Sequence, residues 1–251
     1  MKFTFLGTGV AIPQNDRVQS GLIMEISSKP MLFDCGGGVL NRIFESGYEH
    51  TDIDTIVLTH LHLDHVADVL CLIKANWLCD KTDFTIYGPE GTEKWLSDLM
   101  KIYGYMQEKV DIKVTEVSEG DTFTPEGFDC NITCAAGVHS VPSLGYRVDA
   151  DDVSVVYSGD TEPCKSIMDM SIGADVLIHE CSFPLDFEMT NHTTPDMLVE
   201  MLKDYEDCFG SIYLTHLYPH MQGHEREAIE YIGKQFSGDI KIASDLMKIE
   251  L

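Results

Sequence analysis

The amino-acid sequence predicts an α/β fold in which two mixed β-sheets pack face to face and helices cover their outer sides, a four-layer αββα sandwich. Short β-rich runs alternate with amphipathic segments along the whole chain. Both halves contain consecutive strands as well as strand–helix units, a layout that suggests two sheets around a common core. No internal repeat, low-complexity tract or Pro/Gly/Ser-rich linker interrupts the pattern, so a single domain over residues 1–251 is expected.

The predicted strands are short apolar runs bounded by turn residues. They are Lys2–Leu6, Gly21–Ile26, Met31–Asp34, Thr55–Thr59, Phe84–Tyr87, Asp111–Val117, Asn131–Ala135, Ser154–Tyr157, Asp175–His179 and Ser211–Thr215. The predicted helices show helical spacing of apolar residues. They are Gly38–Ser46, Asp64–Leu78, Thr92–Tyr103, Thr194–Tyr205 and Glu225–Gln235.

Composition limits the class of protein. A chain of 251 residues with 44% hydrophobic content can bury a large core. No stretch approaches the roughly 20 apolar residues of a membrane span, and the first residues lack the pattern of a signal peptide, so a cytoplasmic protein is expected. The eight cysteines are scattered without a CxxC pair, and reduced thiols are therefore expected in place of disulfides.

The net charge is strongly negative. A formal charge of −25 arises from 42 acidic and 17 basic residues, and a field of this sign repels polyanions. Broad nucleic-acid binding is therefore disfavoured, although a local basic groove stays open as an alternative. A salt-rich cytoplasm would also favour such a surface, so charge alone does not specify a function.

The main chemical signal is the run HLHLDH at residues 60–65, directly after an apolar strand. Three imidazoles and a carboxylate within six residues have little structural use, because burying them costs desolvation and none packs as well as an aliphatic side chain. A metal ion explains all four: His60 and His62 can reach one ion from an extended segment, while Asp64 and His65 open the next helix toward a second. Imidazole and carboxylate suit Zn, and also Fe or Mn.

Three further ligand-type side chains follow apolar strands. They are His139, Asp160 and His216. Each alone is more typical of a cap or turn residue, but together they repeat one arrangement, in which a strand delivers a ligand at its end.

The order of these motifs resembles the metallo-β-lactamase superfamily and, more closely, its ribonuclease Z-like branch. The opening FLGTG at residues 5–9, the DCGGG run at 34–38 and the HECSF run at 179–183 also fit that pattern. The resemblance covers nearly the whole chain and implies the metallo-β-lactamase fold. It also implies that Asp34 orients a ligand histidine through the histidine's far nitrogen, while capping of the glycine turn is the alternative role of Asp34.

The resemblance implies a complete dinuclear site. One ion would be held by His60, His62 and His139, the other by Asp64, His65 and His216, and Asp160 would bridge them. Two such ions would lower the pKa of a bridging water and stabilise charge on a phosphoryl or acyl centre.

The catalytic group implied by the resemblance comprises Asp64, Glu180 and His192. His192, oriented by Glu180, would protonate the leaving group. The alternative for His192 is a residue at the start of a helix that Thr193 or Thr194 caps. His220 and His224 are expected at the surface, with a place at the substrate mouth as their alternative.

One departure from the family concerns tRNA. Ribonuclease Z proper carries a tRNA-binding arm between the motifs of His139 and Asp160, whereas residues 140–159 predict only a strand pair with its turn at Asp149–Asp152. The expected function is therefore a phosphodiesterase for a small or short substrate. Ribonuclease Z-type tRNA 3′ cleavage, ester, lactone or sulfate-ester hydrolysis, and a non-enzymatic metal-binding role remain alternatives. Two divalent ions, Zn²⁺ foremost, and a homodimer are expected.

Overall fold

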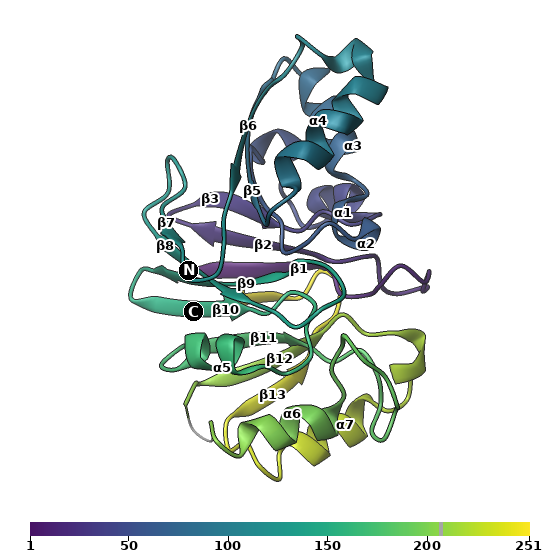
Figure 1. Ribbon diagram of the computed structural model, residues 1–251, viewed down its shortest axis with the longest axis vertical. Helices are drawn as coiled ribbons and strands as arrows, with labels where there is room; N and C mark the ends of the chain where they lie inside the picture. The colour runs from purple at the N-terminus through teal and green to yellow at the C-terminus, as the bar shows by residue number, and fades with distance from the viewer. Residues whose placement is uncertain (206–207) are drawn as a thin grey trace.

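Two seven-stranded sheets form the centre of the protein in a computed structural model that describes residues 1–205 and 208–251. The sheets lie face to face, and each carries its own set of helices on the outside (Figure 1). The predicted order of layers, helices–sheet–sheet–helices, is therefore confirmed. Within the described residues, no helix is both long and apolar enough to cross a membrane.

The first sheet has the strand order β14-β1-β2-β3-β4-β5-β6. Its strands are β1 (Lys2–Gly7), β2 (Gly21–Ile26), β3 (Lys29–Phe33), β4 (Thr55–Val57), β5 (Asp83–Gly88), β6 (Asp111–Glu116) and β14 (Lys248–Glu250). Neighbours from β14 to β3 are antiparallel, and neighbours from β3 to β6 are parallel.

The second sheet repeats this plan in the order β13-β12-β11-β10-β9-β8-β7. Its strands are β7 (Thr122–Phe123), β8 (Asn131–Ala136), β9 (Leu144–Ala150), β10 (Val153–Tyr157), β11 (Val176–Glu180), β12 (Ser211–Thr215) and β13 (Asp239–Ile242). Neighbours from β7 to β10 are antiparallel, and neighbours from β10 to β13 are parallel.

The helices divide between the two outer faces. Those packed on the first sheet are α1 (Val39–Glu45), α2 (Leu63–Val66), α3 (Val69–Trp77) and α4 (Thr92–Ile102). Those packed on the second are α5 (Lys165–Ser171), α6 (Pro195–Leu202) and α7 (Glu225–Ile232). Short 3-10 turns add η1 (His50–Asp52), η2 (Gly104–Met106) and η3 (Pro219–Met221).

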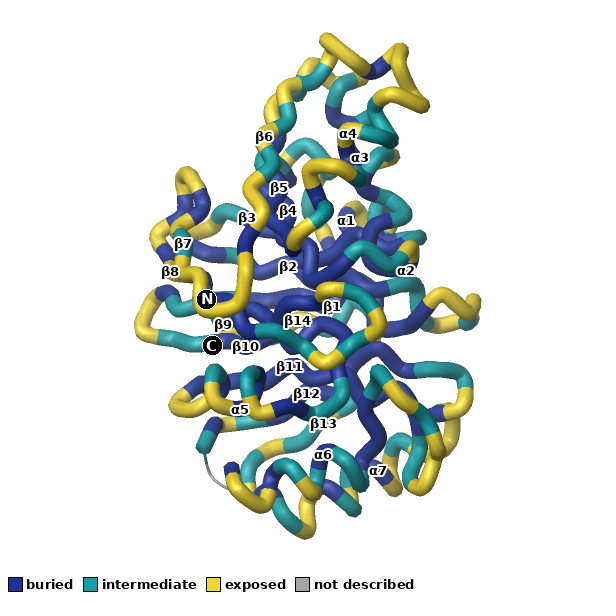
Figure 2. The backbone as a smooth tube through the Cα atoms, in the orientation of Figure 1, coloured by how far each residue is buried: buried dark blue, intermediate teal, exposed yellow. Residues whose placement is uncertain are grey.

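The central strands are buried on both faces (Figure 2). In β2, Leu22 and Met24 belong to the core between the sheets, whereas Ile23 belongs to the core under the helices of the first sheet. Strands that are buried on both sides read as continuous apolar runs without alternation, which is why these strands could be found in the sequence.

One predicted helix is wrong in its extent. The segment Asp64–Leu78 forms two helices, α2 and α3, because Asp68 interrupts the first. The Asp68 amide donates to the Cys35 carbonyl at 2.9 Å. Its carboxylate accepts from the amides of Gly38 and Leu40, at 2.8 and 3.1 Å. The break fixes the glycine turn against the segment that carries Asp64 and His65.

The structure confirms one further prediction and contains elements that the sequence did not predict. The strand pair predicted between His139 and Asp160 is confirmed as β9 and β10. The elements absent from the sequence interpretation are α5, β7, β13, β14 and the 3-10 turns.

Candidate metal centre

The ligand-type residues predicted from the sequence meet where strands of both sheets end. His60 and His62 lie in the loop after β4, and α2 then carries Asp64 and His65. From the other sheet, His139, Asp160 and His216 come shortly after β8, β10 and β12. Their ligand atoms form two close groups, one of His60, His62, His139 and Asp160, the other of Asp64, His65 and His216.

Asp160 lies at the middle of the cluster and is 2% exposed. Its Oδ1 is 3.3 Å from His65 Nε2, and its Oδ2 is 3.3 Å from His216 Nε2. The same Oδ2 lies 3.7 Å from His60 Nε2 and 4.0 Å from His139 Nε2. One carboxylate thus faces residues of both groups.

The hydrogen bonds of two histidines fix where their protons lie. His65 Nδ1 is 2.7 Å from Asp34 Oδ2, and His139 Nδ1 is 2.7 Å from the Asn191 carbonyl oxygen. An ionised carboxylate and a carbonyl only accept, so each Nδ1 must carry the hydrogen. In the neutral imidazole, the Nε2 atom that faces the cluster then presents a lone pair.

Two hydroxyl groups impose the same tautomer on His60 and His216. Thr59 Oγ1 donates to Asp34, at 2.9 Å from Oδ2, and accepts from His60 Nδ1 at 3.0 Å. Ser182 Oγ donates to Glu180 Oε2 at 2.6 Å and accepts from His216 Nδ1 at 3.0 Å. Each hydroxyl has one proton and gives it to a carboxylate, so the histidine must be the donor.

The cluster is therefore rich in acceptors. His60 Nε2 is buried and has no hydrogen-bond partner. His139 Nε2 lies 3.1 Å from His62 Nδ1, and His65 Nε2 lies 3.4 Å from His216 Nε2. The lone pairs of neutral His65 and His216 would repel at this separation unless positive charge lay between them. Since imidazole and carboxylate are the donors that Zn, Mn and Fe accept, the residues fit divalent metal ions.

The electrostatics agree with a cation site. Burial lowers the pKa of His60 well below its usual value of 6.5 and keeps this imidazole neutral. Burial also lowers the pKa of His65, but the charges of Asp160 and Asp34 outweigh it and raise that pKa well above 6.5. The field at His65 thus favours positive charge.

Beside the cluster, Glu180 holds His192. His192 Nδ1 donates to Glu180 Oε1 at 2.8 Å, and the same carboxylate accepts from the amides of Thr161 and Thr193, at 2.8 and 3.1 Å. With the Ser182 hydroxyl, Glu180 accepts four hydrogen bonds, so it has little capacity left for an ion even though it lies close to Asp160 and His216. We therefore separate this pair from the metal ligands.

The sequence interpretation missed several supporting groups. Thr59, Ser182 and the Asn191 carbonyl fix histidine tautomers, and the Tyr157 hydroxyl donates to Asp34 at 3.0 Å. Thr194 caps α6, so the predicted helix start after His192 is confirmed alongside the contact with Glu180. Asp34 and His216 have left-handed backbone conformations, with φ of 56° and 57°.

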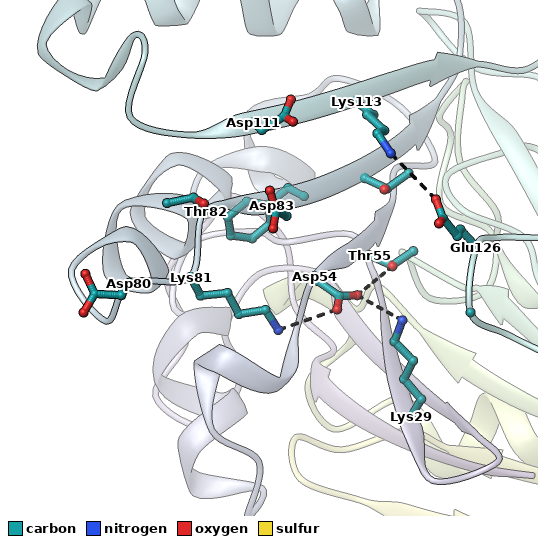
Figure 3. A pocket seen from close by; sticks show the side chains of 13 residues that line it. Lys29, Asp54, Thr55, Asp80, Lys81, Thr82, Asp83, Asp111, Lys113 and Glu126 are labelled. Carbon is teal, nitrogen blue, oxygen red and sulfur yellow. Dashed lines mark hydrogen bonds and ion pairs between the residues drawn. The ribbon is translucent and has the colours of Figure 1, made fainter.

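A hollow in the described part of the chain lies elsewhere. It has a volume of about 610 Å³ and opens at the amino ends of β4, β5 and β6, away from the ligand-bearing ends (Figure 3). Its lysines are paired: Lys29 and Lys81 lie 3.4 and 3.6 Å from Asp54, and Lys113 lies 3.7 Å from Glu126. Because the cluster holds the reactive side chains, we assign the chemistry there in spite of this hollow's size.

Sequence comparisons agree with the geometry. A family model described as "Beta-lactamase superfamily domain" matches residues 30–217. A ribonuclease Z from Mycobacterium bovis is 27% identical over 279 residues, an alignment that covers 100% of this chain and 98% of the relative.

Solved structures with the same fold superpose on this protein. The metallo-beta-lactamase fold protein YhfI from Bacillus subtilis superposes with a TM-score of 0.84 at 25% identity, covering 99% of each chain. The short form of human tRNase Z superposes with a TM-score of 0.78 at 24% identity, covering 100% of this chain and 99% of the other. The family model spans well over half of the sequence, and the chain therefore belongs to the beta-lactamase superfamily and has the metallo-β-lactamase fold.

Proposed function

We propose that this protein is a dinuclear phosphodiesterase that hydrolyses a small or short phosphodiester. Its superfamily and its ribonuclease Z relatives make it a metal-dependent hydrolase of ester bonds. The observation that carries the finer proposal is the acceptor-rich cluster around Asp160 with a carboxylate-supported histidine beside it. When bound, two ions would supply a hydroxide near neutral pH and stabilise negative charge at the phosphorus.

The ligand groups divide around Asp160. We assign His60, His62 and His139 to one ion and the group of Asp64, His65 and His216 to the other, with Asp160 shared. Zn²⁺ is the proposed metal, and Mn²⁺ or Fe²⁺ would suit the same donors.

His192 is the proposed proton donor. Burial lowers its pKa, but the hydrogen bond and charge of Glu180, with Asp160 and Asp64, raise that pKa above 6.5 overall. The raised pKa keeps a proton on Nε2 while Nδ1 is engaged with Glu180. A leaving oxygen on the open side of His192 can take that proton.

The charge around the site favours a substrate with few phosphates. The segments that carry the site, residues 59–66, 137–143, 158–164, 179–193 and 215–224, contain no Lys or Arg. A long RNA is bound largely through such side chains at its phosphates. The ribonuclease Z relatives nevertheless make tRNA 3′ cleavage the second candidate. Ester, lactone or sulfate-ester hydrolysis would use the same residues, and a homodimer remains a prediction.

The first test combines elemental analysis with hydrolysis of bis-p-nitrophenyl phosphate. We expect two ions per chain and metal-dependent release of nitrophenolate. His192→Ala should leave this rate almost unchanged because nitrophenolate needs no proton, and should slow an alkyl phosphodiester by about 10²- to 10⁴-fold. Equal losses on both substrates would contradict the proton-donor role.

The second test compares a dinucleotide with a precursor tRNA across a salt series. Dinucleotide turnover should be the greater and nearly independent of salt, while added salt should weaken the repulsion that opposes RNA. Efficient tRNA cleavage at low salt that falls steeply as salt rises would instead indicate ribonuclease Z activity.

A further inference from the structure

A stack of aromatic side chains begins beside His192 and runs outward. The rings of Phe183 and Tyr218 lie 4.4 Å apart at an interplanar angle of 26°, and those of Phe183 and Phe187 lie 4.5 Å apart at 17°. His220 adds a fourth ring, 5.2 Å from Phe187. Neither β-strand periodicity nor a helix face places these rings together; they come from the two loops after β11 and β12.

The rings of the stack extend from the neighbourhood of His192 to residues that are exposed to solvent. The His192 ring lies 5.6 Å from the Tyr218 ring and 6.2 Å from the Phe183 ring. Phe183 is 7% exposed, whereas Phe187 is 37% exposed and His220 is also exposed. Packing of the loops accounts for the buried end. It leaves unexplained why Phe187 and His220, at the outer end, stay exposed to water.

Exposed apolar side chains adjoin two of the metal-ligand segments. Leu63, beside His62 and Asp64 in the chain, is 72% exposed, and Val138, beside His139, is 48% exposed. The five site segments contain no Lys or Arg that could neutralise a second phosphate. A neutral, planar substituent next to a single phosphate is the chemistry that matches these surfaces.

We propose that the substrate is a phosphodiester whose leaving alcohol carries an aromatic ring, and that this ring stacks on Phe187 and contacts His220, whose ring is inclined at 57° to that of Phe187. This inference rests on the proposed phosphodiesterase function. The ring is assigned to the leaving alcohol because the stack starts at His192. In the reaction, an oxygen from water bonds to phosphorus, the bond from phosphorus to the alcohol oxygen breaks, and the His192 proton completes the alcohol. Nucleosides and aryl alcohols share this chemistry.

The test uses pairs of methyl phosphodiesters that differ in the planarity of the second alcohol. One pair carries uridine or 5,6-dihydrouridine through its 5′ oxygen, and the other carries benzyl or cyclohexylmethyl alcohol. With metal-loaded protein, kcat/KM should favour the planar member of at least one pair by roughly 5- to 150-fold, the range expected for stacking of one ring. The product should be the free aromatic alcohol with methyl phosphate. Preference within the uridine pair identifies a nucleoside, and preference confined to the benzyl pair identifies an aryl alcohol.

Phe187→Leu should reduce this preference to near unity because it keeps an apolar side chain and removes the ring. Phe44→Leu is the matched control, since Phe44 is 69% exposed on α1 and away from the stack. Calorimetric binding of benzylphosphonate and cyclohexylmethylphosphonate gives a readout apart from turnover, and benzylphosphonate should lose its advantage only in Phe187→Leu.

Two results would overturn the inference and are distinguishable. Hydrolysis of all four diesters without preference for a planar ring, or a preference that survives Phe187→Leu, rejects the aromatic subsite and leaves the phosphodiesterase function standing. Failure of the metal-loaded protein to hydrolyse any of the diesters rejects the proposed function and the subsite with it.

Discussion

Ser182 contacts both His216 of the metal cluster and Glu180, the partner of His192. Its replacement tests whether this hydroxyl fixes the tautomer of His216. Its hydroxyl accepts from His216 Nδ1 at 3.0 Å and donates to Glu180 Oε2 at 2.6 Å. Ser182→Ala deletes both contacts, together with the approach of the hydroxyl to the His216 carbonyl at 3.0 Å, without changing a metal-ligand atom. His216 then either keeps a buried Nδ1–H without this acceptor or moves the proton to Nε2, where it blocks the metal.

The magnitude follows from the burial of the site. Ser182 is fully buried and His216 is 3% exposed, so water cannot easily replace the lost acceptor. A buried donor left unsatisfied costs about 1–3 kcal/mol, which is about 5- to 150-fold in an equilibrium constant. Loss of a group that supports a metal-bound histidine typically lowers metal affinity by about 10- to 100-fold. Because His216 is assigned to only one ion, only one ion should be weakened.

The assay is a chelator titration followed by elemental analysis. We expect Ser182→Ala to release one ion at a chelator concentration about 10- to 100-fold lower than the wild type requires. Ser171→Ala is the control, because Ser171 is equally buried but its hydroxyl donates only to the Ile167 carbonyl, within α5. Retention of both ions at wild-type affinity in Ser182→Ala would refute the tautomer argument, as would equal metal loss in both variants.

Three further predictions follow from other groups. Asp160→Ala should abolish stable occupancy of at least one ion by elemental analysis, and retention of both ions and of activity would reject its bridging role. The His192 pKa is raised above 6.5 and the proton donor acts in its charged form, so turnover of an alkyl diester should fall as pH rises through that pKa. Glu180→Gln removes the charge that raises the pKa and should move this fall to lower pH in the pH–rate profile; an unmoved profile would contradict the pairing. Cys71 and Cys79 are exposed and should react first with a thiol reagent. The buried thiols of Cys35, Cys130, Cys134 and Cys181, whose pKa burial raises, should react only on unfolding, as mass spectrometry of labelled peptides would show.

The strands predicted with correct bounds include β2 and β12, which are buried over almost their whole length. β13 escaped prediction because it is an edge strand of four residues, two of them the charged Asp239 and Lys241. The break between α2 and α3 depends on Asp68 bonding to Gly38, a contact across 30 residues that no local pattern encodes.

The candidate site also has a part that the sequence predicted and a part that it did not. The seven ligand-type residues could be predicted because each follows or adjoins an apolar strand, and the structure brings all of them together. The groups that orient them could not. A backbone carbonyl such as that of Asn191 has no sequence signature, and a serine such as Ser182 gains its role only when the loop after β11 meets the loop after β12.

The separation of the ligands along the chain has a consequence for biosynthesis. His65 and His216 are 151 residues apart, yet their Nε2 atoms meet at 3.4 Å. A ribosome delivers the HLHLDH run early, as loose histidines without the partners that fix their tautomers. The first ligand group is complete only once Asp160 has emerged, and the second only after His216. Stable metal loading is therefore expected to follow the docking of the two sheets at the end of translation, so that the metal content of a preparation measures the fraction of chains that finished folding.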